Sequence, residues 1–133
     1  LDAIDKGEGP TIMGDGSEAF DFVSVLDCAA ANVCAMNADI AGEYYNVGTG
    51  TRTSLKELAE MLLQLTGSNQ AIQYKERSQA TLVRNRIGDP SKATKDINFV
   101  ASIKLKEGLQ ALIDWRANHI EEVEQRRAKV ARR

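Results

Sequence analysis

Apolar residues recur at helical spacing near the middle of this 133-residue chain. Between residues 55 and 65 they fall every three or four positions, at Leu55, Leu58, Ala59, Leu62 and Leu65. This spacing predicts a helix with one apolar face. Ser54 followed by Glu57 matches a capping box, in which the two side chains bond exposed N–H groups at a helix start. Gly67 is typical of the residue just past a helix end.

A strand and a glycine loop are expected immediately before this helix. Glu43–Val47 is rich in aromatic and β-branched residues, which favours a strand. The loop Gly48–Gly50 then precedes a helix N-terminus, where unbonded N–H groups and the helix dipole can hold a phosphate. However, Thr53 stands where a G-x-G-x-x-G motif has its third glycine, and there is no Walker lysine. The residues alone therefore favour a tight turn with the helix packed behind it.

The remaining pattern predicts short strands between helices. Strands are expected at Thr11–Met13, Asp21–Val25 and Ala71–Lys75. Ile103 to Leu105 forms a linker or a short strand. A chain that mixes strands and helices in this order is of the α/β class, with mixed α+β elements.

Four further helices are expected around these strands. Leu1–Lys6 reads as the end of a helix, and Cys28–Asn37 as a helix with Ser24 or Asp27 as its cap. A short helix begins with Asp89 as N-cap and Pro90 at its first position, and ends near Asn98. A last helix starts at Lys106 or Glu107 and keeps its apolar stripe as far as Val123.

Composition and charge exclude several function classes. A chain of this length forms one domain with a single core, and 43% hydrophobic with 27% charged residues is ordinary for a soluble globular protein. The formal net charge of −2 gives no reason to expect nucleic acid as a partner. No apolar run approaches the ~20 residues that a membrane span needs, so we expect no membrane partner.

The cysteines and the N-terminus indicate compartment and completeness. Cys28 and Cys34 lie six residues apart on one predicted helix, which excludes a disulfide between them. With one His and no C-x-x-C, no metal site is expected. Buried, reduced thiols fit a cytoplasmic protein. The chain begins Leu-Asp-Ala-Ile-Asp, without Met or a visible signal peptide, so we expect a fragment.

Four motifs in a fixed order resemble a known family. They are G-D-G-S-E-A-F-D-F-V (14–23), E-Y-Y-N-V-G-T-G-T-R-T-S-L-K-E-L-A (43–59), R-I-G-D-P-S-K-A (86–93) and K-L-K-E-G-L-Q-A-L-I-D-W (104–115). Together they resemble the C-terminal part of NAD-dependent nucleotide-sugar epimerases and dehydratases. These are extended short-chain dehydrogenases, of which UDP-glucose 4-epimerase is the best-known type. The resemblance implies a nucleotide-sugar-binding domain over residues 1–116 and a charged helical extension over 117–133.

The resemblance also implies what this chain lacks. The family's N-terminal Rossmann domain binds NAD through a G-x-x-G-x-x-G loop, and its catalysis uses Tyr-x-x-x-Lys. Here Tyr44, Tyr45 and Tyr74 are followed four residues later by Gly48, Thr49 and Ser78. No Tyr–Lys pair is available as a general base, so no catalytic residue is expected. No cofactor is expected in this chain either, because the absent domain binds NAD in the full-length family.

Three substrate-binding residues follow from the same resemblance on the side of the nucleotide base. In relatives, the strand before G-D-G holds the base through its backbone, which maps to Thr11 and Met13. Relatives often carry an aromatic ring at the latter position, so Met13 is a softer platform. Thr51, just after the glycine loop, is expected to touch the base.

Three more candidates lie on the pyrophosphate side. Arg84 and Arg86 both precede D-P-S-K-A, where many relatives carry an arginine. Phe20 occupies a position where relatives often have a pyrophosphate-binding arginine, and Phe cannot donate that hydrogen bond. The alternative for the two arginines is a solvated surface, and for Phe20 it is packing in the core or at a domain interface.

Two functions remain open at this level. The first is the substrate-binding half of a nucleotide-sugar epimerase or dehydratase, inactive alone and binding its nucleotide sugar weakly. The alternative is a free-standing binding or self-assembly module derived from that domain. The last helix continues past Trp115 with Ile120, Val123 and Val130, and its apolar stripe has little of its own domain to pack on. We therefore expect a homo-oligomer.

A nucleic-acid role for the C-terminal arginines is disfavoured. Arg126, Arg127, Arg132 and Arg133 are interleaved with acidic residues at Glu121, Glu122 and Glu124. This mixture of signs suits a helix stabilised by pairs four residues apart rather than a surface for phosphates.

Overall fold

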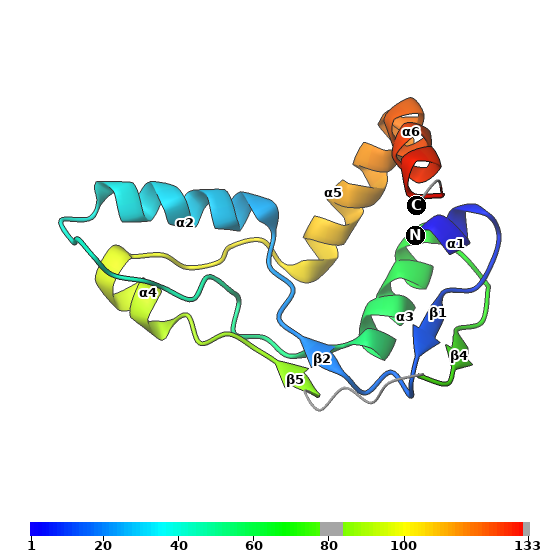
Figure 1. The fold of residues 1–133 in the computed structure, drawn as a ribbon, viewed down its shortest axis with the longest axis horizontal. Helices are drawn as coiled ribbons and strands as arrows, with labels where there is room; N and C mark the ends of the chain where they lie inside the picture. The colour runs from blue at the N-terminus through cyan, green and yellow to red at the C-terminus, as the bar shows by residue number, and fades with distance from the viewer. Residues whose placement is uncertain (78–83, 132–133) are drawn as a thin grey trace.

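Figure 1 shows the computed structural model, which describes residues 1–77 and 84–131. One end of the elongated molecule holds two helices, α2 (Val25–Asn37) and α4 (Ser91–Ile97). The other end holds the long helices α3 (Leu55–Thr66) and α5 (Leu105–Asn118), with two small sheets beside them. The fold mixes helices and short strands, which confirms the α/β class that the sequence predicts.

The two sheets are formed by five short strands. β1 (Thr11–Met13) pairs in parallel with β4 (Gln73–Lys75), which confirms both predicted strands. In the second sheet, the central strand β2 (Ala19–Phe20) is antiparallel to β3 (Thr53–Ser54) and parallel to β5 (Asn85–Arg86). The strand predicted at residues 21–25 is wrong, because the chain leaves the sheet after Phe20 and enters α2 at Val25.

Helix α3 begins and ends as its sequence predicts. The Ser54 hydroxyl accepts from the Glu57 amide at 3.1 Å, and the Glu57 carboxylate accepts from the Ser54 amide at 2.7 Å. At the other end, Gly67 has a left-handed φ of 65°. The contacts between Ser54 and Glu57 bond N–H groups that the first turn of the helix would otherwise leave without partners. The helix packs against α5.

Helix α2 starts three residues earlier than predicted. Ser24 is its cap, since its hydroxyl accepts from the Leu26 amide at 3.2 Å. Asp27, the other candidate cap, is buried and bonds to a distant segment instead. Its carboxylate accepts from the Ser102 amide and hydroxyl, both at 3.0 Å, and from the Ile103 amide at 3.1 Å. Asp27 therefore fixes α2 to the chain just before α5.

A small apolar core lies between α2 and α4. It consists of Ala31 from α2, Ala93 and Ile97 from α4, and Phe99 just beyond. Cys34 and Tyr45 pack at its edge. Both cysteines are unpaired and only partly buried, so the predicted burial of the thiols is met in part. Helix α4 starts at Ser91, one residue later than predicted, and ends at Ile97 with Asn98 as its C-cap, which agrees with the predicted end near Asn98.

The strand predicted at Glu43–Val47 is wrong in this structure. Among the described residues no strand lies beside this segment, and its backbone groups make no hydrogen bond to another backbone group. A strand is defined by pairing, so strand-forming side chains are not sufficient without a neighbouring strand. The segment is held by side chains, including a 2.9 Å ion pair between Glu43 and Lys92 of α4.

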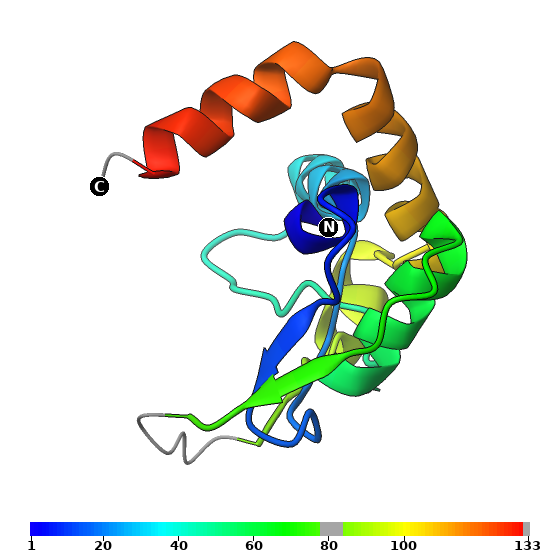
Figure 2. The same ribbon diagram turned by 90° about the vertical axis from the view of Figure 1, so that its right-hand side faces the viewer.

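The predicted last helix is two helices that meet at His119. α5 starts at Leu105, just before the predicted start at Lys106 or Glu107, and α6 spans Ile120–Ala131. The His119 ring stacks on Trp115 with centroids 4.6 Å apart, and its Nδ1 lies 2.8 Å from the Trp115 carbonyl. Figure 2 shows α6 turning away from the axis of α5 at this point.

After the turn, α6 packs on its own domain. Arg127 of α6 and Arg116 of α5 both pair with Asp2 and Asp5 of α1 (Asp2–Asp5). Val123 is buried, so the expectation that the α6 stripe has little to pack on is wrong at this position. The Val130 side chain and residues 132–133, which enter two of the predictions above, lie outside the described residues.

The described residues contain neither a membrane-spanning helix nor a metal-binding cluster. None of the helices there is both long and apolar enough to cross a membrane. No group of three or more His, Cys, Asp or Glu side chains in those ranges is arranged to hold a metal ion.

Candidate functional site

The glycine loop is organised around the carboxylate of Asp21, the residue that follows β2. This carboxylate accepts from the Thr49 amide at 3.0 Å, the Thr49 hydroxyl at 2.6 Å and the Gly50 amide at 2.9 Å. A Cβ atom built on Gly48 would lie 2.5 Å from Asp21 Oδ2. Burial raises the pKa of Asp21, but bonds from Thr49, Gly50 and Gly88 outweigh it, and the pKa lies below its ordinary value.

This arrangement decides between the two interpretations of the loop. Its amide groups already bond an internal anion, the Asp21 carboxylate, which disfavours the phosphate-binding interpretation. The loop does not fit the diphosphate of a dinucleotide such as NAD, since Asp21 occupies the donors and its charge repels a second anion. The nearby residues therefore offer no phosphate cradle at this position.

The three-stranded sheet brings two predicted site residues together. Phe20 on β2 is in register with Thr53 on β3 and with Arg86 on β5. Residues directly opposite each other project from the same face, so these three share one face of the sheet. Phe20 is half-buried, and its ring centroid lies 6.0 Å from that of Phe22. Arg86 is exposed.

A cavity of about 320 Å³ continues from this face. Phe22, Thr51 and Thr53 line one wall, and Ser102 and Lys104 line the other. Thr51 is a predicted site residue, whereas the other lining residues were missed. The position of Phe22, two residues after Phe20, and the position of Thr53, two residues after Thr51, are signals that could have identified them.

The structure does not bring Thr11 and Met13 into the same sheet as Phe20. Both are exposed residues of β1, with Ile12 buried between them. The Met13 carbonyl accepts from the Arg77 guanidinium at 3.2 Å, and Arg77 also pairs with Glu18 at 2.8 Å. The backbone of Met13 is thus already bonded to a side chain of its own chain.

Arg84 lies just before β5, and its backbone carbonyl takes part in the pairing of the sheet. Its carbonyl accepts from the Ala19 amide at 2.9 Å, which extends the pairing of β2 with β5. Its side chain is exposed. Arg84 is therefore close to Arg86 in the chain and at the same edge of the sheet.

Comparisons with known proteins match this chain to one family. A family model described as the NAD dependent epimerase/dehydratase family matches residues 1–48. A protein of Methanocaldococcus jannaschii with the provisional name UDP-glucose 4-epimerase is 34% identical over 120 residues, which are 90% of this chain and 38% of that protein. The UDP-glucose 4-epimerase of Mycolicibacterium smegmatis is 29% identical over 117 residues, 88% of this chain and 37% of its own length.

Solved structures agree with these relatives. The UDP-glucose 4-epimerase of Thermotoga maritima, solved with UDP-glucose, has a TM-score of 0.79 at 31% identity and covers 86% of this chain. The UDP-N-acetylglucosamine 4-epimerase of Methanobrevibacter ruminantium, in complex with UDP-N-acetylmuramic acid, has a TM-score of 0.78 at 28% identity and covers 88%. The matches lie in the C-terminal part of the longer proteins. This chain corresponds to the C-terminal part of an NAD-dependent epimerase/dehydratase.

The resemblance and the fold class predicted from the sequence are confirmed by these matches. This epimerase/dehydratase segment spans 37% of the Thermotoga chain and 37% of the Methanobrevibacter chain. The chain is therefore well under half the length of the relatives that it matches.

One further arginine of the epimerase/dehydratase segment, Arg52, stabilises the three-stranded sheet. Arg52 crosses from the loop before β3 to β5, where its Nε donates to the Asn85 side chain at 3.2 Å. Its NH2 group donates to the Ser17 carbonyl at 3.3 Å. Ser54 on β3 and Asn85 on β5 are both in register with Ala19 of β2, on the face opposite Phe20. Arg52 therefore stabilises the sheet from that opposite face.

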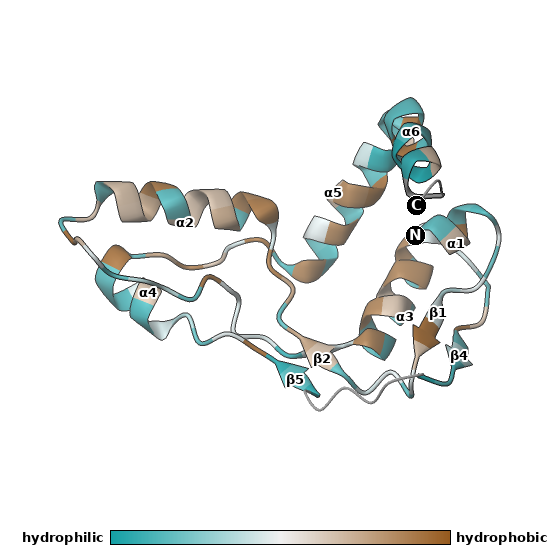
Figure 3. Ribbon diagram, in the orientation of Figure 1, coloured by the Kyte–Doolittle hydropathy of each residue, from teal (hydrophilic) through white to brown (hydrophobic). Residues whose placement is uncertain are grey.

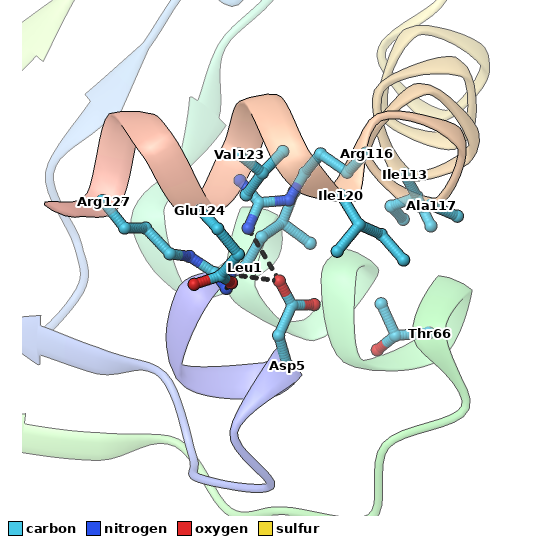
Figure 4. Close-up of a pocket in the computed structure, with 10 residues that line it drawn as sticks. All are labelled: Leu1, Asp5, Thr66, Ile113, Arg116, Ala117, Ile120, Val123, Glu124 and Arg127. Atoms are coloured by element: carbon cyan, nitrogen blue, oxygen red, sulfur yellow. Dashed lines mark hydrogen bonds and ion pairs between the residues drawn. The ribbon is translucent and has the colours of Figure 1, made fainter.

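A second cavity, of about 300 Å³, lies among α1, α3, α5 and α6. Figure 4 shows its lining, with Arg116 and Arg127 both directed at Asp5. Apolar side chains such as Ile113 and Val123 form much of the remaining wall. None of the six predicted site residues lines it. Both arginines in its lining already pair with Asp5, so we assign this cavity to the packing of α6 against α1.

Proposed function

We propose that this chain is the nucleotide-sugar-binding part of an NAD-dependent epimerase or dehydratase and is inactive alone. The observation that carries the proposal is the shared face of Phe20, Thr53 and Arg86 beside the cavity that contains Thr51. An aromatic ring, hydroxyl groups and a guanidinium suit the planar base, the sugar and the phosphates of one ligand. The Thermotoga relative was solved with UDP-glucose, which fits the same ligand class.

Each site residue has a distinct role in this proposal. Arg86, helped by Arg84, bonds the pyrophosphate, and Thr51 contacts the base. Phe20 covers an apolar part of the ligand but donates no hydrogen bond. Thr11 and Met13 contribute only if the base reaches the other sheet. NAD is bound by the part of the family's proteins that this chain lacks, so the affinity of this chain alone for a nucleotide sugar is weak.

Calorimetric titration with UDP-glucose tests the site. We expect weak binding that is lost when Arg84→Ala and Arg86→Ala are combined, because each charge-assisted bond contributes about 1.5–3 kcal/mol. Arg126→Ala is the matched control, because Arg126 lies over Trp115 on the helical side of the molecule. Micromolar binding that survives the double substitution places the site elsewhere.

A second candidate function is a self-assembly module, and one observation favours it. Helix α2 carries exposed apolar side chains, among them Leu26, Val33 and Met36, and exposed apolar patches tend to find a partner. This candidate predicts a homo-oligomer, for which a single species of 14.5 kDa in sedimentation velocity would be the contrary result. Within both candidates we propose a cytoplasmic protein with no nucleic-acid or membrane partner, and residues 117–133 as an extension of the domain.

A further inference from the structure

Helix α6 makes little apolar contact with the rest of the domain. Figure 3 shows it mostly teal, the colour of hydrophilic residues. Among its described side chains Val123 alone is buried, and Ile120 at its start is 64% exposed. A helix that packs by an apolar face normally buries several residues of one stripe. The position of α6 therefore depends largely on polar contacts.

These polar contacts come from an ion cluster of Asp2, Asp5, Arg116 and Arg127. Arg127 of α6 pairs with Asp2 at 2.9 Å and with Asp5 at 2.6 Å. Arg116 of α5 pairs with the same two carboxylate oxygens, at 2.5 Å and 2.7 Å. Within α6, Arg127 also pairs with Glu124 at 2.5 Å. Each aspartate oxygen bonds both arginines, so the ion cluster is complete only while α6 lies against α1 (Figure 4).

The ion cluster is open to dissolved salt. The side chains of Asp2 and Asp5 are 58% and 42% exposed, and those of the two arginines 21% and 24%. Salt screens ion pairs that are this exposed. Hydrogen bonds from Arg116 and then Arg127 lower the pKa of Asp2 to about 2, and a hydrogen bond from Arg116 lowers the pKa of Asp5. Both carboxylates are therefore charged near neutral pH, where salt rather than pH weakens the cluster.

His119 gives α6 a point about which it can turn. Its amide donates to the Arg116 carbonyl at 3.3 Å at the end of α5, and its carbonyl accepts from the Val123 amide at 3.1 Å at the start of α6. His119 itself has φ −129° and ψ 44°, so it belongs to neither helix. A change in these two angles moves α6 and leaves the backbone hydrogen bonds of α5 in place, as in a hinge.

We propose that α6 is an ionic strap. It is closed over the cavity of about 300 Å³ at low ionic strength, and at high ionic strength it is released at His119 and loses its helix. The helix is lost because isolated helices shorter than ~12–15 residues are marginal in water, and α6 has 12 residues. This inference does not rest on the nucleotide-sugar proposal, since none of the six predicted site residues lines the cavity.

Amide hydrogen exchange of the whole chain at about 0.01 M and about 1 M NaCl tests the strap. The screening length falls from about 30 Å to about 3 Å over this range. We expect exchange in α6 to be about fivefold or more faster at the higher concentration, because a released helix no longer protects its amides. Helix α3 is the internal reference, and its exchange should change by less than about twofold.

Arg127→Gln removes the charge that α6 contributes to the ion cluster. In this variant we expect α6 to exchange fast at low salt already, and to change by less than about twofold at high salt. Lys129→Gln is the matched control, because it removes one positive charge from an exposed position of the same helix. In a variant with Asp2→Asn and Asp5→Asn, adding Arg127→Gln should change the exchange of α6 by less than about twofold, since the partners are already absent.

Three results would overturn the proposal. The first is exchange in α6 that is equal at the two salt concentrations. The second is an equal effect of Arg127→Gln and Lys129→Gln. The third is an acceleration of α3 in step with α6, because it reports opening of the whole domain rather than release of one helix. If the variant with both aspartates replaced does not fold, the comparison of Arg127→Gln with Lys129→Gln decides by itself.

Discussion

Gly48 is a residue at which this structure tolerates little change. A methyl group there would lie 2.5 Å from Asp21 Oδ2, closer than non-bonded atoms approach. The carboxylate cannot retreat without giving up its bonds to Thr49 and Gly50.

We predict that Gly48→Ala lowers the free energy of unfolding by about 1–3 kcal/mol, the range for overpacking. The matched control is Gly88→Ala, whose Cβ would lie 3.5 Å from the same oxygen, an ordinary contact. Urea denaturation of both variants is the measurement. Equal stability of the two variants would show that the loop yields to the added methyl group.

At the scale of single residues, local signals were readable from the sequence and distant partners were not. The capping box of Ser54 and Glu57 spans three residues, so its chemistry is visible in the sequence. Asp21 bonds a loop 28 residues away and Asp27 a segment 75 residues away. Such partners depend on the fold, so the sequence offers Asp27 only as one of two possible caps and gives no role for Asp21.

At the scale of elements, Asp27 is the contact that joins α2 to the start of α5. Burial raises the pKa of Asp27, but hydrogen bonds from Ser102 and Ile103 outweigh that effect and place the pKa below its ordinary value of 3.8. A carboxyl group with a lowered pKa in the folded state adds stability above its unfolded pKa. That stability is lost as the pH falls through the lower folded pKa.

We predict that Asp27→Asn destabilises the protein at pH 7 by about 1–3 kcal/mol, because an amide NH2 would face the Ile103 N–H. The difference from the unsubstituted protein should shrink as the pH falls below the ordinary pKa of 3.8 and through the lower pKa of the folded state, where the Asp27 carboxyl of the folded protein becomes protonated. Urea denaturation at pH 7 and pH 3 measures both. A difference that is the same at the two pH values would mean that charge on Asp27 plays no part. Asp39→Asn, at an exposed position, is the control.

Helix α3 was predictable as an element because its cap, stripe and stop all lie within it. Glu43–Val47 was not, since a strand needs a partner that the described chain does not supply. The break at His119 was missed for another reason. The apolar stripe continues across it, and the stacking of His119 on Trp115 depends on the turn itself.

At the scale of the whole molecule, the site was predictable in part. Phe20 and Arg86 meet because β2 and β5 pair in register, and Thr51 lines the adjoining cavity. The separation of Thr11 and Met13 into a second sheet could not be predicted from motif order. That separation depends on the pairing of β1 with β4, about 60 residues later in the chain.

We predict that this chain alone does not convert nucleotide sugars. It contains no Tyr-x-x-x-Lys pair, and its glycine loop bonds Asp21 instead of a diphosphate. Incubation with NAD and UDP-, dTDP- or GDP-sugars, followed by chromatography, is the measurement. The Thermotoga maritima epimerase with UDP-glucose serves as the positive control. Turnover above the uncatalysed rate would contradict the prediction.

The carboxylate in the glycine loop also determines how the loop responds to its surroundings. Asp21 belongs to the same chain as the loop amides that it bonds. It therefore competes with dissolved anions for those amides at an effective concentration of about millimolar or higher. Free phosphate or sulfate would have to displace the Asp21 carboxylate, which the chain itself holds beside the loop. Because the Asp21 carboxylate also repels a second anion, we expect anions in the medium to leave the loop unchanged while Asp21 is ionised and bonded to Thr49 and Gly50.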